Sequence, residues 1–300
     1  MLTKAIVRPS APNFGEGLTT ADLGAPNHGQ ALAQHEAYCV ALEQCGLTLI
    51  RLDPDPVYPD STFVEDTAVL VTHHQGPRTA EPNDQVDDRS HPLTQVVLTK
   101  PQAVLTRPGA PSRSGEVESM RKALADFVPS LGEIQPPGTL DGGDVCEAGN
   151  HFFIGISERT NEAGARQLAE LLARFGYTSS FVDITKGGMG VPPVTHAQDA
   201  RATHHILHLK SGIAFLGDNR LVVIEALADR PEFRGYDLVR ISDGEEYAAN
   251  CVRVNDRVLV AAGYPVFESQ LQALGYQTIA LEMSEFQKMD AGLSCLSLRF

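Results

Sequence analysis

The sequence repeats a unit in which a helical pattern ends at a glycine and a short apolar run follows. Five glycines mark these junctions: Gly46, Gly132, Gly176, Gly235 and Gly275. In the clearest case, apolar residues between positions 165 and 175 recur every three or four residues, as they do along one helix face. Thr160 is a candidate N-cap of this helix, and Gly176 is a candidate C-cap.

Short apolar runs between these junctions predict β-strands. They cover residues 48–50, 68–72, 96–99, 103–106, 152–156, 206–209, 221–224, 236–239, 258–261 and 278–281. A strand–strand–helix–strand unit that recurs about five times is an internal repeat. Such units cannot bury a face alone, and five of them close around a central axis. We therefore predict an α/β fold, a five-bladed ββαβ propeller, with residues 1–300 in one domain.

Two segments interrupt the repeat and are predicted to be loop insertions. Residues 73–95 are polar and rich in Pro, Asp and His, and residues 186–204 contain Gly-Gly and Pro-Pro pairs. The second segment leads directly to His208. It could therefore form a lid over a site there, and an ordinary surface loop is an equal alternative.

Charge and cysteine content restrict the class of partner. A formal net charge of −14 argues against nucleic acid and anionic membrane surfaces, which require basic patches, and favours a cationic substrate over an anionic one. An acidic surface can also serve solubility alone. Five dispersed cysteines without a C-x-x-C pair fit a reducing compartment. Because the sequence shows neither a signal-peptide pattern nor an apolar run of the ~18 residues a membrane span needs, we expect a cytoplasmic protein.

Cys295 lies five residues from the end of the chain, where most proteins fray. Small residues precede it, and residues 295–300 alternate like a buried strand. A buried structural cysteine is the simplest interpretation. The alternative is a nucleophile, which needs a base or cation to hold its thiolate.

Histidines 204, 205 and 208 are the candidate partners for this thiol. On a helix, His204 and His208 would share a face and could bind a metal. The apolar alternation at 206–209 instead predicts a strand, where the two side chains lie too far apart to chelate one ion. We therefore expect no metal and no organic cofactor.

Acidic residues cluster immediately before two predicted strands. Asp60, Glu65 and Asp66 precede the strand at 68–72, and Asp141 and Asp144 flank a Gly-Gly pair. Acid-rich turns are common in isolation. Two of them could instead line a pocket for a guanidinium, whose planar donors match carboxylates.

Seven motifs occur in the order found in the dimethylarginine dimethylaminohydrolases, which this chain resembles. They are NFGEGL at 13–18, FVED at 63–66, LTRPG at 105–109, LDGGD at 140–144, SERTN at 157–161, LHLKS at 207–211 and GLSC at 292–295. These guanidino-modifying enzymes have the five-bladed propeller called the pentein fold. The resemblance covers nearly the whole chain apart from the two insertions.

The resemblance implies a role for each matching residue. Cys295 would attack the guanidinium carbon to form an S-alkylthiouronium intermediate. His208 would protonate the departing amine and then activate water, with Asp141 beside it. The residues that would contact substrate are Leu18 in a flap, the acids Asp60, Glu65 and Asp66, the α-carboxylate ligands Arg107 and Arg159, and Met289, Asp290 and Ser294. The insertion at 73–95 departs from the shorter family members.

Two rival functions remain open. An arginine deiminase or amidinotransferase shares the superfamily, but deiminases carry His-x-Asp, and the second residue after His208 is Lys210. We therefore expect a preference for methylated arginine over arginine. A non-catalytic, ribosome-binding propeller shares the fold, but it does not need a Cys/His/acid set. The expected partner is a small guanidino cation; a homodimer is left open. An exposed thiolate at Cys295 would be sensitive to zinc or nitrosation.

Overall fold

The computed structural model describes residues 1–71, 101–128, 131–185 and 206–300. The predicted strand at 96–99 and the two predicted loop insertions, at 73–95 and 186–204, lie outside these residues. Within the described part of the chain, no helix has the length and hydrophobicity needed to cross a membrane.

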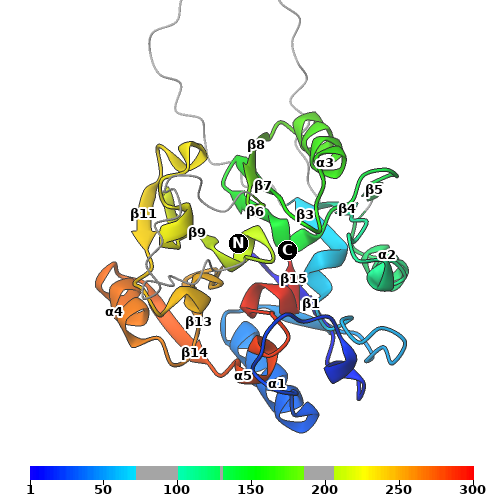
Figure 1. Cartoon of the computed structure of the whole chain (residues 1–300), viewed down its shortest axis with the longest axis horizontal. Helices are drawn as coiled ribbons and strands as arrows, with labels where there is room; N and C mark the ends of the chain where they lie inside the picture. The colour runs from blue at the N-terminus through cyan, green and yellow to red at the C-terminus, as the bar shows by residue number, and fades with distance from the viewer. Residues whose placement is uncertain (72–100, 129–130, 186–205) are drawn as a thin grey trace, which may run out of the picture.

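The described strands form five three-stranded sheets, and Figure 1 shows them arranged around a common centre. The sheets are β15-β1-β2 (Ser297–Arg299, Lys4–Val7, Thr48–Arg51), β3-β4-β5 (Ala68–Val71, Gln102–Leu105, Leu131–Glu133), β6-β7-β8 (Val145–Ala148, His151–Ile156, Thr178–Asp183), β9-β10-β11 (Ile213–Gly217, Arg220–Val223, Asp237–Arg240) and β12-β13-β14 (Val252–Val254, Arg257–Ala261, Gln277–Leu281). In each, the first strand is antiparallel to the second, which is parallel to the third. The predicted five-bladed architecture is confirmed.

Each parallel pair requires a crossover, and a helix supplies it in four of the blades. The crossovers are α1 (His28–Gln44), α2 (Glu116–Leu124), α3 (Glu162–Arg174) and α4 (Pro265–Ala273), with a short additional helix α5 (Ser284–Gln287) before the last turn. Between β10 and β11 the connection contains two short 3-10 helices, η6 (Glu225–Leu227) and η7 (Pro231–Phe233).

The two ends of the chain close the ring. Strand β15 pairs with β1, which places Ala5 opposite Arg299 and Val7 opposite Ser297. The N–H of Phe300 also donates to the Lys4 carbonyl at 2.9 Å. Both termini therefore lie near the centre of the molecule (Figure 1), and the last strand is held in a sheet as its apolar alternation predicted.

The blades share their apolar cores. Phe153 of β7 packs edge-to-face against Phe233 of the next blade, with 5.0 Å between ring centroids. Both rings belong to a buried cluster that continues into β9, β10 and β13. A blade on its own would expose much of this surface, which explains why the repeats must assemble as a ring.

The glycine junctions are largely as predicted. Four of them have φ between 84° and 99°, which favours glycine: Gly46, Gly176, Gly235 and Gly275. Gly132 was wrongly assigned to a helix-to-strand junction, because it lies inside β5. The predicted N-cap Thr160 was also wrong: Asn161 caps α3, its side chain accepting the N–H of Gly164, while the Thr160 hydroxyl donates to Asp144.

Two predicted strands begin differently. Residues 206–209 are not a strand but lead into the 3-10 helix η5 (Leu209–Ser211), because the N–H of Leu209 donates to a carboxylate of Asp144 instead of a neighbouring strand. Cys295 lies in the 3-10 helix η9 (Leu293–Leu296), and β15 begins only at Ser297. In both cases a turn precedes the innermost strand of a blade.

This turn recurs in all five blades. The 3-10 helices η2 (Val64–Thr67), η4 (Gly142–Asp144), η5, η8 (Glu246–Ala249) and η9 each precede the first strand of a sheet. η2 packs against η4 and η9, and η5 packs against η4 and η8. The repeat therefore gathers five short turns at one end of the central axis. Glu65, Asp66, Ser294 and Cys295 lie on these turns, and Asp141 and His208 directly precede two of them.

Candidate active site

The Gly-Gly pair of η4 lets these turns approach closely. A Cβ on Gly142 would lie 2.0 Å from the Glu65 carbonyl oxygen, and a Cβ on Gly143 would lie 2.8 Å from Nδ1 of His208. Neither position can hold a side chain without moving the neighbouring turn. The Gly-Gly pair therefore allows the neighbouring turns to pack closely.

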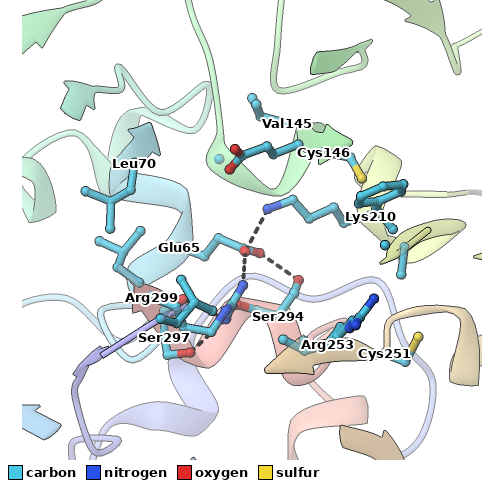
Figure 2. A pocket seen from close by; sticks show the side chains of 18 of the residues that line it. Glu65, Leu70, Val145, Cys146, Lys210, Cys251, Arg253, Ser294, Ser297 and Arg299 are labelled. Carbon is cyan, nitrogen blue, oxygen red and sulfur yellow. Dashed lines mark hydrogen bonds and ion pairs between the residues drawn. The ribbon is translucent and has the colours of Figure 1, made fainter. Parts of the chain in front are cut away.

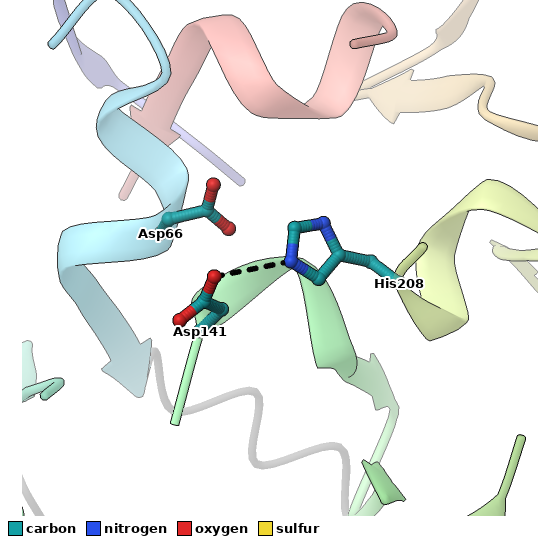
Figure 3. A group of neighbouring side chains, drawn as sticks. All are labelled: Asp66, Asp141 and His208. Carbon is teal, nitrogen blue, oxygen red and sulfur yellow. Dashed lines mark hydrogen bonds and ion pairs between the residues drawn. The ribbon is translucent and has the colours of Figure 1, made fainter. Parts of the chain in front are cut away.

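His208 and Asp141 are in direct contact. Nε2 of His208 lies 3.1 Å from Oδ2 of Asp141, and both side chains are buried. Oδ1 of the same aspartate accepts the N–H of Gly109 at 2.8 Å. Figure 3 shows the carboxylates of Asp66 and Asp141 on the same side of the imidazole. The pairing predicted for His208 and Asp141 is present in the structure.

Asp66 is held by two donors on its own carboxylate. Oδ1 accepts the N–H of Gly143 at 2.8 Å, and Oδ2 accepts a guanidinium N–H of Arg113 at 2.6 Å. Arg113 is itself buried and also bonds Glu116. Burial alone would raise the pKa of Asp66, but His208 and Arg113 lower it to about 2, so Asp66 is an anion at neutral pH.

The sequence interpretation missed Arg113. The only local signal was its i, i+3 relation to Glu116, which is typical of a surface helix pair. Its decisive contact is with a carboxylate 47 residues away, which no local pattern reports.

The carboxylates set the charge of His208. Burial would lower the pKa of His208, but Asp66, the hydrogen bond to Asp141, and Asp144 raise it to about 9. The imidazole is therefore protonated at neutral pH and can give up a proton.

The Cys295 thiol is 8 % exposed and lies on η9 beside η2. Burial, together with the negative charges of Glu65 and Asp66, raises the pKa of Cys295 to about 12. Without a bound cation this cysteine is a thiol. A positive charge placed among the same acids would favour the thiolate.

A small cavity of about 30 Å³ opens beside His208. Eight of the predicted site residues line it: Leu18, Asp60, Asp66, Asp141, Arg159, His208, Met289 and Asp290. Phe63, Arg113, Leu207 and Ala291 complete its wall. The cavity is far smaller than the ~300–1,000 Å³ typical of small-molecule sites, so a substrate-sized ligand enters only if part of the wall moves.

The wall contributed by Leu18 is held by hydrogen bonds. The N–H of Leu18 donates to both carboxylate oxygens of Asp60, at 3.1 and 3.2 Å. Asp290 accepts the N–H and the hydroxyl of Thr20 and the hydroxyl of Thr19. Leu18 remains 39 % exposed. Asp60 and Asp290 therefore fasten this loop across the cavity.

Glu65 and Ser294 face the other side, onto the central channel, whose cavity is about 900 Å³. Figure 2 shows the Glu65 carboxylate between Lys210, Ser294 and Arg299. It accepts from Nζ of Lys210 at 2.7 Å, from Oγ of Ser294 at 2.6 Å and from the Arg299 guanidinium at 3.3 Å. All four side chains of this ion-paired group line the channel.

The two predicted carboxylate-binding arginines occupy different positions. Arg159 lines the small cavity. Arg107 does not; its guanidinium donates to the Gly138 carbonyl at 3.0 Å, and its backbone bridges Leu140. The α-carboxylate role of both arginines remains a prediction.

Three side chains are close enough together to be ligands of one metal ion. Oxygen or nitrogen atoms of Asp66, Asp141 and His208 lie within 4.8 Å of one another. Arg113, Gly143 and Gly109 already occupy three of the four carboxylate oxygens. The expectation that the protein uses no metal remains a prediction, and His204 lies outside the described residues.

Five three-stranded blades around a channel, four of them with the ββαβ order, carry a cysteine, a histidine and carboxylates on the turns at one end. This arrangement is that of the pentein class of guanidino-modifying proteins. No family model matches the chain. It is 37 % identical to N(G),N(G)-dimethylarginine dimethylaminohydrolase of Pseudomonas aeruginosa, and the match covers both chains fully. It is 31 % identical to the protein of the same name from Streptomyces coelicolor, and that match covers 99 % of this chain and 96 % of the relative. The chain belongs to the dimethylarginine dimethylaminohydrolase family.

Solved structures agree with this assignment. A cysteine-to-serine mutant of the Pseudomonas aeruginosa enzyme, complexed with citrulline, has a TM-score of 0.81 at 35 % identity, with both chains fully covered. The N-terminal domain of the arginine dihydrolase ArgZ, at 13 % identity and a TM-score of 0.75 over all of this chain and 98 % of that domain, shares the fold.

Proposed function

We propose that this chain hydrolyses Nω-methylated arginine to citrulline and a methylamine through a covalent intermediate on Cys295. The observation that carries the proposal is the buried group formed by His208, Asp66 and Asp141, in which Asp66 also acts electrostatically on Cys295. It combines a proton donor with anions that attract a guanidinium. Membership of the family supports the same substrate class.

The first half-reaction begins when the guanidinium enters among the acids. Its charge opposes that of Glu65 and Asp66, which hold the pKa of Cys295 high, and so stabilises the thiolate as the thiol releases its proton to solvent. The sulfur forms a bond to the guanidino carbon. The carbon–nitrogen bond to the methylated nitrogen then breaks, and His208 gives that nitrogen its proton. The products are a methylamine and an S-alkylthiouronium on Cys295.

The second half-reaction reverses the proton flow. His208, now neutral, accepts a proton from water while the water oxygen bonds to the same carbon. The carbon–sulfur bond breaks, and the sulfur takes the proton of the new carbon-bound hydroxyl, which becomes the carbonyl of citrulline. Citrulline leaves, and Cys295 is again the resting thiol. Asp141 holds the imidazole throughout, because it keeps Nε2 engaged at 3.1 Å.

The position of Lys210 supports a preference for methylated arginine. Its ammonium bonds Glu65 on the channel side. The position therefore supplies no carboxylate to grip free guanidino nitrogens, as the His-x-Asp motif of the deiminases would.

A citrulline assay across dimethylarginine, monomethylarginine and arginine tests this function. We expect kcat/KM to be highest for a methylated substrate. Arginine as the best substrate would favour a deiminase, and no turnover of any guanidino compound would favour a non-catalytic propeller.

Of the partners expected from the sequence, the small guanidino substrate is the one that the proposed function includes. The other expectations remain predictions. They are a homodimer, the lack of nucleic-acid and membrane partners, and a cytoplasmic location. The acidic surroundings of Cys295 argue for slow reaction with nitrosating reagents in the free protein, so the sensitivity expected of an exposed thiolate applies to the substrate-bound state.

A further inference from the structure

Asp144, the second acid of the LDGGD motif, is fully buried at the end of η4 and has no assigned role. Oδ1 accepts the N–H of Leu209 at 2.9 Å. Oδ2 accepts the hydroxyls of Ser157 and Thr160, each at 2.6 Å. All three bonds are donated to the carboxylate, and they join the third blade to the turn that begins the fourth.

The bond to Leu209 fixes the backbone beside the imidazole. Leu209 follows His208, so its amide position determines where the imidazole leaves the chain. Gly155 shows how closely this contact is packed: a Cβ there would lie 2.8 Å from Oδ1 of Asp144 and 2.9 Å from Cβ of Leu209. The carboxylate therefore acts as a fixed anchor for η5.

The other two bonds fix the turn that carries Arg159. The Ser157 hydroxyl donates to Asp144 and accepts the N–H groups of Arg159 and Thr160, each at 3.0 Å. The Thr160 hydroxyl donates to Asp144 and accepts the N–H of Asp141 at 3.1 Å. One carboxylate thus orients two turns on the cavity wall.

Three donors converge on this side chain, and an ionised carboxylate matches them. Burial raises the pKa of Asp144 to about 6, against the opposing effects of His208 and the two hydroxyls, so it is an anion above that pH. An amide of the same shape offers one oxygen and an NH₂ group, and cannot accept all three.

We propose that Asp144 is a positioning residue that holds the His208 imidazole and the Arg159 guanidinium in register. The two ends of one substrate, the guanidino carbon and the α-carboxylate, would then be aligned by one side chain. This inference rests on the proposed function, in which His208 transfers the protons and Arg159 binds the α-carboxylate.

Two variants separate the two sets of contacts that Asp144 makes, the bond to Leu209 beside His208 and the hydroxyl bonds that lead to Arg159. Asp144→Asn disturbs both sets, and Ser157→Ala removes only a hydroxyl bond that leads to Arg159. Each is assayed with dimethylarginine and with the analogue in which hydrogen replaces the α-carboxylate. Glu268→Gln is the matched control, because it weakens another hydroxyl–carboxylate bond, from Thr278 at 2.9 Å, in the last crossover.

For Ser157→Ala we expect KM for dimethylarginine to rise about 10-fold, the equivalent of 1.4 kcal/mol, with kcat unchanged and the decarboxylated analogue unaffected. For Asp144→Asn we expect kcat to fall about 100-fold on both substrates, as a small displacement of a proton donor does, and KM to rise for dimethylarginine alone. Glu268→Gln should alter neither parameter.

Two results would overturn the inference. One is a folded Asp144→Asn variant whose kcat equals that of the wild type on both substrates, since a structural role would lower only the thermal midpoint. The other is a Ser157→Ala variant that affects both substrates equally, and this decides the matter even where Asp144→Asn does not fold. A wild type that forms no citrulline contradicts the proposed function as well.

Discussion

At the residue scale, the site works through charges that are buried but compensated. Arg113 illustrates this best: it is surrounded by Asp66, Glu116 and two backbone carbonyls, and it keeps Asp66 anionic beside His208. That anion shifts the pKa of two titrating groups in the same direction, with opposite consequences for their charge. It raises the pKa of the imidazole and also that of the thiol, so the resting site holds an imidazolium and a neutral Cys295.

The first prediction concerns pH. Because His208 must be protonated to release the amine, kcat should fall as pH rises through about 9. The same group binds its proton more tightly when folded. Its contribution to the free energy of unfolding is therefore complete below the ordinary value of 6.5 and is lost as pH rises through about 9.

Asp141→Asn tests the cause, since it removes one of the groups that raise this pKa. We expect the alkaline limb of the kcat profile to move to lower pH, with kcat reduced about 10-fold or more. Asp126→Asn, an exposed acid just beyond α2, is the control. An alkaline limb that stays in place in the Asp141 variant would show that another group controls it.

Residue types in short motifs identified His208, Asp141 and Cys295 as candidates, but could not reveal what holds them. Asp144 and Arg113 act through partners 65 and 47 positions away. The apolar alternation around His208 also predicted a strand, because the pattern does not record that a buried carboxylate captures the next amide.

At the element scale, the recurring unit is the 3-10 turn followed by the first strand of a blade. The helices that end at a glycine could be predicted from the sequence. Gly176 and Gly275 have positive φ, which glycine adopts without steric cost, so a glycine after a helical pattern marks the helix end. The turn could not be predicted, because η9 and β15 together look like one apolar alternation. The fourth blade likewise keeps its glycine, Gly235, although its crossover contains no α-helix.

The second prediction concerns the loop that carries Leu18. Asp290→Ala removes an acceptor shared by three donors on Thr19 and Thr20. We expect the loop to close less often and KM to rise about 10-fold with a smaller change in kcat, measured by steady-state kinetics. Asp22→Ala, an exposed acid on the same loop, is the control. Equal KM values in both variants would show that the latch does not limit binding.

At the scale of the whole molecule, the propeller ring creates a channel across which charged side chains from different blades meet. Glu65, from the second blade, joins Lys210 of the fourth with Ser294 and Arg299 of the first. These side chains lie far apart in sequence and meet only because the ring closes through β15. The architecture could be predicted from the repeat, whereas the ion pairs across the axis could not.

The third prediction tests this group. Glu65→Leu leaves two partly buried cations without their carboxylate and should lower the free energy of unfolding by about 3 kcal/mol in urea denaturation. Adding Lys210→Met to the same chain should restore part of that loss, because it removes one unpaired cation. A loss below about 1 kcal/mol, as exposed pairs give, would mean that the channel solvates these groups.

The most direct test is the mass of the protein during turnover. Rapid acid quenching followed by peptide mapping should find an adduct on Cys295, and none on the other four cysteines or in Cys295→Ser. Dimethylarginine and monomethylarginine should give adducts of identical mass, because the methylated nitrogen has already left. Citrulline formation without such an adduct, or an adduct that retains the methyl groups, would contradict the covalent mechanism.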